Sequence, residues 1–101
     1  MSVEEMKGRH RAFVFIDVAP GKDKKVLEKL IKYDEVVEAH LIAGQYDVLA
    51  VLEFGLYGRE LFAPAQEVIS NFVIEKIRNL KDVRDTNTIY PTLSVTKRKT
   101  A

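Results

Sequence analysis

The first half of the chain changes from a strand-like period of two to a helical period at Pro20-Gly21. Residues 12–18 are mostly β-branched or aromatic, and they are apolar on both alternating faces until Asp17, which predicts a strand covered on both sides. Beyond the glycine, apolar residues at helical spacing predict a helix over about residues 22–33. Its apolar stripe consists of Val26, Leu27, Leu30 and Ile31.

Two apolar runs of strand length, residues 36–43 and 46–54, then flank Gly44. Glycine takes a positive φ without steric cost, so the pattern predicts a two-residue hairpin turn of type II′ between the runs. Such a turn also sets the register, because it pairs Ala43 with Tyr46 and Leu41 with Val48.

The two faces of this predicted hairpin differ in character. One face is wholly apolar or aromatic, which predicts that helices cover it; it consists of Ala39, Leu41, Ala43, Tyr46, Val48, Ala50 and Leu52. The other face is too apolar for open water and too polar for an ordinary core, which predicts a surface for assembly with another subunit. It carries Glu38, His40, Ile42, Asp47, Leu49, Val51 and Glu53.

A second helix and a last strand follow. Gly55 and Gly58 predict a loop, and Pro64 suits the first turn of a helix, where its missing N–H costs nothing. An apolar stripe extends this helix to about residues 79–81. Residues 83–90 then alternate as a strand until Pro91 interrupts pairing. One face of this strand carries Thr86, Thr88 and Tyr90.

The order β-α-β-β-α-β, joined by right-handed crossovers, predicts an α+β fold, the ferredoxin-like sandwich. Its antiparallel sheet has helices on one face only, so a partner has to cover the other face. We therefore expect at least a dimer through sheet-to-sheet packing, of the dimeric α+β barrel type. We place this single domain at residues 12–96, between a flexible N-terminal segment (1–11) and a basic C-terminal tail (97–101).

Composition narrows the classes of function. Sixteen basic and fifteen acidic residues give a net charge of +1, so the electrostatic field of the protein does not favour nucleic acid over any other partner. The absence of cysteine excludes a disulfide framework, a thiolate metal site and a cysteine nucleophile. Neither a signal peptide nor a membrane-spanning run is recognised, so we expect a cytoplasmic protein without a membrane partner.

Few residues suit catalysis or metal binding. The two histidines, His10 and His40, have no second ligand at a spacing typical of metal sites. With no phosphate loop and no nucleophile signature, we predict no catalytic residue, metal or cofactor. Asp47 breaks a local rule, because aspartate is disfavoured in strands and here it stands in an apolar run. Two interpretations stay open for it: a binding residue, or a carboxylate that caps its own turn.

Two segments carry a resemblance to a known family. They are Gly44-Gln45-Tyr46-Asp47 followed by Val48-Leu49-Ala50-Val51, and the stretch 83–89 (VRDTNTI) after the second helix. In their order and spacing they resemble the effector-binding domain, or RAM domain, of Lrp/AsnC transcription regulators. The resemblance implies a ferredoxin-like domain that dimerises, forms rings of dimers and binds a small effector, typically an amino acid, between adjacent dimers. Our hypothesis for the partner is a full-length regulator of this family, with which the domain would co-assemble.

The chain departs from that family at its beginning. Full-length members carry an N-terminal helix-turn-helix, whereas only residues 1–11 precede the first predicted strand here. Because DNA recognition needs a helix that enters the major groove, we expect no direct DNA binding. The expected function is a regulatory module that binds an effector and is not an enzyme.

The resemblance also implies roles for individual residues, because an amino acid presents both a carboxylate and an ammonium group. The turn glycine and its neighbour would let the effector approach backbone N–H groups, Asp47 would attract the ammonium group, and two threonines would donate hydroxyl hydrogen bonds. Turn chemistry, packing and strand formation stay open as other reasons for these residue types. The predicted effector-binding set is Gly44, Gln45, Tyr46, Asp47, Thr86 and Thr88.

Two other functions share the predicted topology. One is a small enzyme, such as the dimeric ferredoxin-like oxygenases, with a pocket inside each subunit that holds His40, Asp47 or Tyr46. The other is an ACT-type amino-acid sensor, which does not share the pattern of Tyr46-Asp47 and Thr86-Thr88. The place of the ligand, inside one subunit or between dimers, discriminates the enzyme from the regulatory module.

Overall fold

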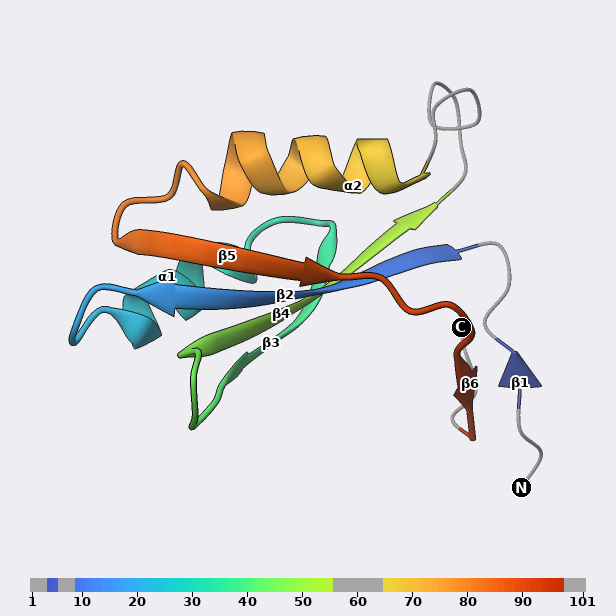
Figure 1. The fold of residues 1–101 in the computed structure, drawn as a ribbon, viewed down its shortest axis with the longest axis horizontal. Coiled ribbons are helices and arrows are strands. Elements are labelled where there is room, and N and C mark those ends of the chain that lie inside the picture. Colours follow the sequence, from blue (N-terminus) through green and yellow to red (C-terminus); the bar gives the residue numbers. More distant parts are fainter. Residues whose placement is uncertain (1–3, 6–8, 56–64, 98–101) are drawn as a thin grey trace.

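A computed structural model describes residues 4–5, 9–55 and 65–97 (Figure 1). The main sheet has four antiparallel strands in the order β3-β4-β2-β5. This topology confirms the predicted β-α-β-β-α-β order and the α+β, ferredoxin-like fold. The elements are β2 (Arg9–Val18), α1 (Asp23–Leu30), β3 (Val36–Leu41), β4 (Val48–Gly55), α2 (Ala65–Phe72) with its π-helical continuation η2 (Val73–Ile77), and β5 (Val83–Ile89).

A second, two-stranded sheet joins β1 (Glu4–Glu5) to β6 (Val95–Thr96), and Figure 1 shows it set apart from the main sheet. Strand β2 begins three residues before the predicted boundary, at Arg9. Whether residues 1–11 move independently of the domain stays a prediction. The predicted loop at Gly58 and the helix start at Pro64 lie outside the described residues. Among the described helices, none has the length and apolarity needed to cross a membrane.

Both helices pack on one face of the main sheet, where the core lies. Alternate residues of β2 are buried there, and their antiparallel partners on β4 lie beside them. The predicted helix-covered face is confirmed for Val48, Ala50 and Leu52, each 0% exposed. The helices contribute Val26, Leu30, Ile69, Val73 and Ile77 to the same core.

Both helices differ from the predictions at their ends. Helix α1 begins at Asp23 and ends at Leu30, because the Tyr33 N–H donates to the Leu30 carbonyl (3.1 Å) and turns the chain toward β3. The second helix was expected to continue to residues 79–81, but it ends as a π-helical turn at Ile77. Asp82 then adopts φ +77°, which starts a new chain direction before β5.

The predicted two-residue turn is wrong, although the register that it implied is correct. Leu41 pairs with Val48, as expected. The strands end at that pair, however, so a connection of six residues, 42–47, takes the place of the tight turn. Gly44 has a positive φ, but its value of +136° is far from the value near +60° that a type II′ turn requires. Leu41 is 41% exposed, so the helices do not cover this end of the hairpin.

The face opposite the helices, here called the open face, includes Phe13, Phe15, Leu49, Val51 and Ile89. Val51 is 4% exposed without belonging to the helix-side core, and Ile89 is 46% exposed. The sequence predicted that β2 is covered on both sides. Within this chain the prediction is confirmed for the side that faces the helices.

Candidate effector-binding loop

Asp47 is the best anchored residue of the connection between β3 and β4. Its backbone N–H donates to the Ile16 carbonyl (3.0 Å), and its carbonyl accepts the Ile42 N–H (2.9 Å). Its carboxylate Oδ2 accepts the Val18 N–H at 3.0 Å. Asp47 thus joins the end of β2 to both ends of the loop, which we call the Asp47 loop (residues 42–47).

The aromatic neighbour Tyr46 attaches the same loop to the open face. Its ring lies 5.6 Å from the ring of Phe15, centroid to centroid, at an angle of 41°. Phe15 alternates with the buried residues Val14 and Ile16, so it points away from the helices. The prediction that Tyr46 lies on the helix-covered face is therefore wrong. The strict alternation of the strand ends before residue 46, which allows the ring to turn to the other side.

Gly44 and Gln45 lie at the exposed tip of the loop, between Ile42 and the anchored residues Tyr46 and Asp47. A Cβ built on Gly44 would meet no atom within 4 Å, so steric crowding is not the reason for glycine at this position. The reason is the backbone, because φ +136° is a conformation that residues with a Cβ rarely adopt. The tip therefore presents backbone groups to the surroundings without a covering side chain at Gly44.

The two predicted threonines lie on β5, on the other side of β2 from the loop. Thr86 pairs with Ile16 and Thr88 pairs with Val14, and both threonines are partly buried on the helix side of the sheet. Two strand spacings separate β4 from β5, which corresponds to about 10 Å. The structure thus brings the loop and Thr86 to the same segment of β2. Within one chain it does not bring all six predicted residues into one shared contact.

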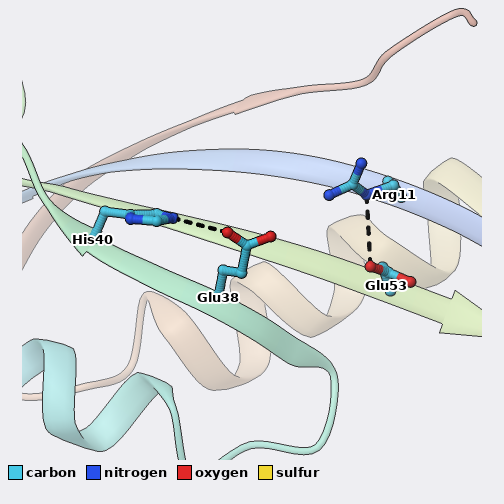
Figure 2. Close-up of polar contacts among 4 residues, drawn as sticks. All are labelled: Arg11, Glu38, His40 and Glu53. Carbon is cyan, nitrogen blue, oxygen red and sulfur yellow. Dashed lines mark hydrogen bonds and ion pairs between the residues drawn. The ribbon is translucent and has the colours of Figure 1, made fainter. Parts of the chain in front are cut away.

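Four polar side chains of the open face form two pairs (Figure 2). His40 Nε2 lies 3.2 Å from Glu38 Oε1, with both side chains about half exposed on edge strand β3. Arg11 Nε lies 3.7 Å from Glu53 Oε2, and the guanidinium group stands over the Phe13 ring at 5.4 Å. His40 therefore lies at the open face and not in the core. Within the described ranges, no group of three His, Asp or Glu residues is placed to hold a metal ion.

Sequence reasoning missed the partners of the loop. The groups that hold it are the Val18 N–H, the Ile16 carbonyl and the Phe15 ring. The backbone groups belong to apolar residues of a strand, so their side chains carry no polar signal. The one signal in the sequence was the position of Asp47 itself, an aspartate beside an apolar strand.

The strand order and the anchored loop define a ferredoxin-like α+β domain. Residues 11–55, which include β3, the Asp47 loop and β4, match the model of the family described as the Lrp/AsnC ligand binding domain. This match over residues 11–55 agrees with the resemblance. One curated relative is an uncharacterized HTH-type transcriptional regulator of Pyrococcus furiosus, 33% identical over 81 residues, a match that covers 77% of this chain and 48% of the relative. The chain spans about half the length of the curated relatives it matches.

Solved structures extend the likeness over most of the chain. A hypothetical protein from Pyrococcus horikoshii matches with a TM-score of 0.67 and 29% identity, over 84% of this chain and 92% of that one. A transcriptional regulator from Neisseria meningitidis, solved as a complex with L-Met, matches with a TM-score of 0.65 over 90% of this chain and 53% of that one. Its identity is 18%, so this second likeness shows the fold alone.

Proposed function

We propose that the protein is a regulatory module that binds an amino acid at the Asp47 loop and carries out no chemistry. The family match supports a ligand-binding role in regulation, and it includes the whole loop. The observation that carries the proposal is the exposed tip Gly44-Gln45 between two fixed anchors, because a preorganised backbone loses little entropy when it binds. The L-Met complex of the Neisseria regulator, which shares this fold, supports an amino acid as the ligand.

The proposed site consists of Gly44, Gln45, Tyr46, Asp47, Thr86 and Thr88. Backbone N–H groups at the tip would meet the carboxylate of the amino acid, a charge-assisted contact that is stronger than a neutral hydrogen bond. The hydroxyl groups of Thr86 and Thr88 would supply further donors. Asp47 either holds the loop in shape or meets the ammonium group, and different substitutions separate these two roles.

The proposal includes assembly, because the loop and the threonines lie on opposite sides of β2. A second copy packed on the open face would cover Phe13, Phe15 and Leu49, and adjacent dimers would then complete each site. The polar pairs Arg11–Glu53 and His40–Glu38 would stand among these apolar groups. The same contacts would allow mixed assemblies with full-length regulators of the family. We propose such a regulator as the partner.

A thermal-shift screen of the purified protein against the common L-amino acids tests binding. A ligand at a hundredfold excess over its Kd adds about 2.7 kcal/mol, and each kcal/mol raises the Tm of a domain this small by roughly 4–8 °C. We expect one amino acid, or a chemically related group, to raise the Tm. A flat response across the whole panel would contradict amino-acid binding.

The contribution of the threonines is tested with Thr88→Val, which removes the hydroxyl group and keeps the shape of the side chain. We expect the Kd of the selected amino acid to rise by roughly three- to tenfold, the value of one hydrogen bond. Thr92→Val is the matched control, because Thr92 is exposed and lies outside β5. Equal affinity of the two variants would remove Thr88 from the site.

Assembly through the open face is tested with Leu49→Lys, measured by analytical ultracentrifugation. A lysine here would place a charge in the proposed apolar contact, so we expect lighter species than for the unmodified protein. The control is Ile74→Lys, because Ile74 lies on η2 and is 54% exposed. If both variants assemble as the unmodified protein does, the partner does not pack on the open face.

A further inference from the structure

We infer that Asp47 is a positioning residue of the proposed effector site: its carboxylate fixes the loop to strand β2 through the Val18 N–H, and it is not the partner of the ligand's ammonium group. This inference rests on the proposed function and assigns one residue of that site. Ligand binding then depends on the loop geometry that Asp47 maintains, and it does not depend on an attraction between the charge of Asp47 and the ammonium group.

The position of the Val18 N–H explains why a carboxylate is needed. The ladder between β2 and β4 ends at the pair Ile16 and Val48, so β4 offers no backbone carbonyl to Val18 in that ladder. Val18 is 5% exposed, and a buried N–H without an acceptor is unfavourable. Asp47 Oδ2 accepts this hydrogen bond at 3.0 Å. The side chain thus continues the ladder by one bond after the backbone of β4 has left it.

The other two bonds of Asp47 show that the same residue controls the shape of the loop. Its N–H is bound to Ile16 and its carbonyl to Ile42, the first residue of the loop. The N–H and the carboxylate therefore hold Asp47 to β2, its carbonyl holds Ile42, and the exposed tip lies between the two ends of the loop that these bonds fix. A rotation of the carboxylate that took Oδ2 toward a ligand's ammonium group would leave the Val18 N–H without this acceptor.

The two roles make different demands on charge. An ammonium group is bound most strongly by an anionic oxygen. A backbone N–H also donates to a neutral amide oxygen, although more weakly than to a carboxylate, and asparagine carries such an oxygen at the same position. Asparagine at position 47 therefore preserves the positioning role and removes the charge, whereas alanine removes both.

The first experiment measures the Kd of Asp47→Asn, Asp47→Ala and the unmodified protein by calorimetry. The probe is the amino acid with the largest shift in the screen, with L-methionine measured in every case. We expect Asp47→Asn to stay within about threefold of the unmodified protein and Asp47→Ala to weaken binding by about tenfold or more. Asp34→Ala is the matched control, because Asp34 is exposed and lies in the turn before β3. An equal loss in both Asp47 variants would overturn the inference, because it would show that the charge binds the ligand.

The second experiment needs no ligand, so it separates a failure of this inference from a failure of the proposed function. Hydrogen exchange of the Val18 amide, followed by NMR, should be slow in the unmodified protein and in Asp47→Asn. We expect fast exchange in Asp47→Ala, together with shifted amide resonances of Gly44 and Gln45. Unchanged exchange and unchanged loop resonances in Asp47→Ala would overturn the positioning role even if an amino acid binds. If no amino acid binds and these NMR changes occur, the loop geometry stands and the ligand class is wrong.

Discussion

The hydroxyl oxygens of Ser70 and Tyr90 lie 2.8 Å apart, so a side-chain hydrogen bond joins helix α2 to the end of β5. The Tyr90 hydroxyl group also donates to the Gln66 carbonyl at 3.4 Å, and its ring packs against the core. Strand β5 ends at Ile89, one residue before the predicted end at Tyr90, and Pro91 follows Tyr90. This contact holds the edge strand under the helix at the point where backbone pairing stops.

Tyr90→Phe should therefore lower the free energy of unfolding by about 1 kcal/mol, the usual net value of one hydrogen bond. Ser70→Ala should have a similar effect, measured by urea denaturation. The double variant should lose less than the sum of the two, because the same contact is removed twice. Strictly additive effects would show that the two hydroxyl groups do not stabilise each other.

Gly44→Ala should destabilise the fold by about 1 kcal/mol through backbone strain, because φ +136° is unfavourable for alanine although the space is open. Asparagine tolerates the left-handed region near +57° but not this conformation. Gly44→Asn should therefore be as unfavourable as Gly44→Ala. At Gly21, where φ is +78°, asparagine should be better tolerated than alanine. Equal losses for asparagine at both glycines, measured as Tm, would contradict this explanation.

Leu30 and Ile31 are adjacent at the end of α1, but their side chains differ in burial. Leu30 is 0% exposed and belongs to the core, whereas Ile31 is 51% exposed. Leu30→Ala should cost roughly 2–5 kcal/mol in chemical denaturation, because it leaves a cavity. Ile31→Ala should change the stability by less than about 0.5 kcal/mol in a monomer. A larger effect at Ile31 that depends on protein concentration would reveal a contact between subunits there.

Asp17 and Asp85 are directly paired across β2 and β5, which places two carboxylates on neighbouring positions of the open face. Like charges at such positions destabilise a sheet. Asp85→Asn should therefore raise the free energy of unfolding by roughly 0.2–1 kcal/mol. The gain should shrink as salt is added, because exposed charges are screened. Asp34→Asn, which removes one exposed charge away from the sheet, should not show this gain.

Much of the fold was predictable because it depends on local patterns. The alternation of residues 12–18 and the helical stripe from Val26 to Leu30 reflect which side chains avoid water, and that preference is a property of the residues themselves. The register of Leu41 with Val48 was also correct, because strand pairing fixes which face each residue takes. The ends of the helices were less predictable, since the turn at Tyr33 depends on where the next strand pairs.

The candidate site was predictable only as a stretch of sequence. An aspartate beside an apolar strand marked residue 47, but nothing in the residues around it identified its partner.

The sequence by itself determined the six elements, their order and the helix-side core of this protein. Only the tertiary structure decided the six-residue loop, the contact of Tyr46 with Phe15 and the acceptor role of Asp47. The physical reason is that hydrophobic burial follows the side chains along the chain, whereas the hydrogen bond from Val18 joins backbone and side chain across 29 positions. Such a bond exists only after β2 and β4 have been brought together.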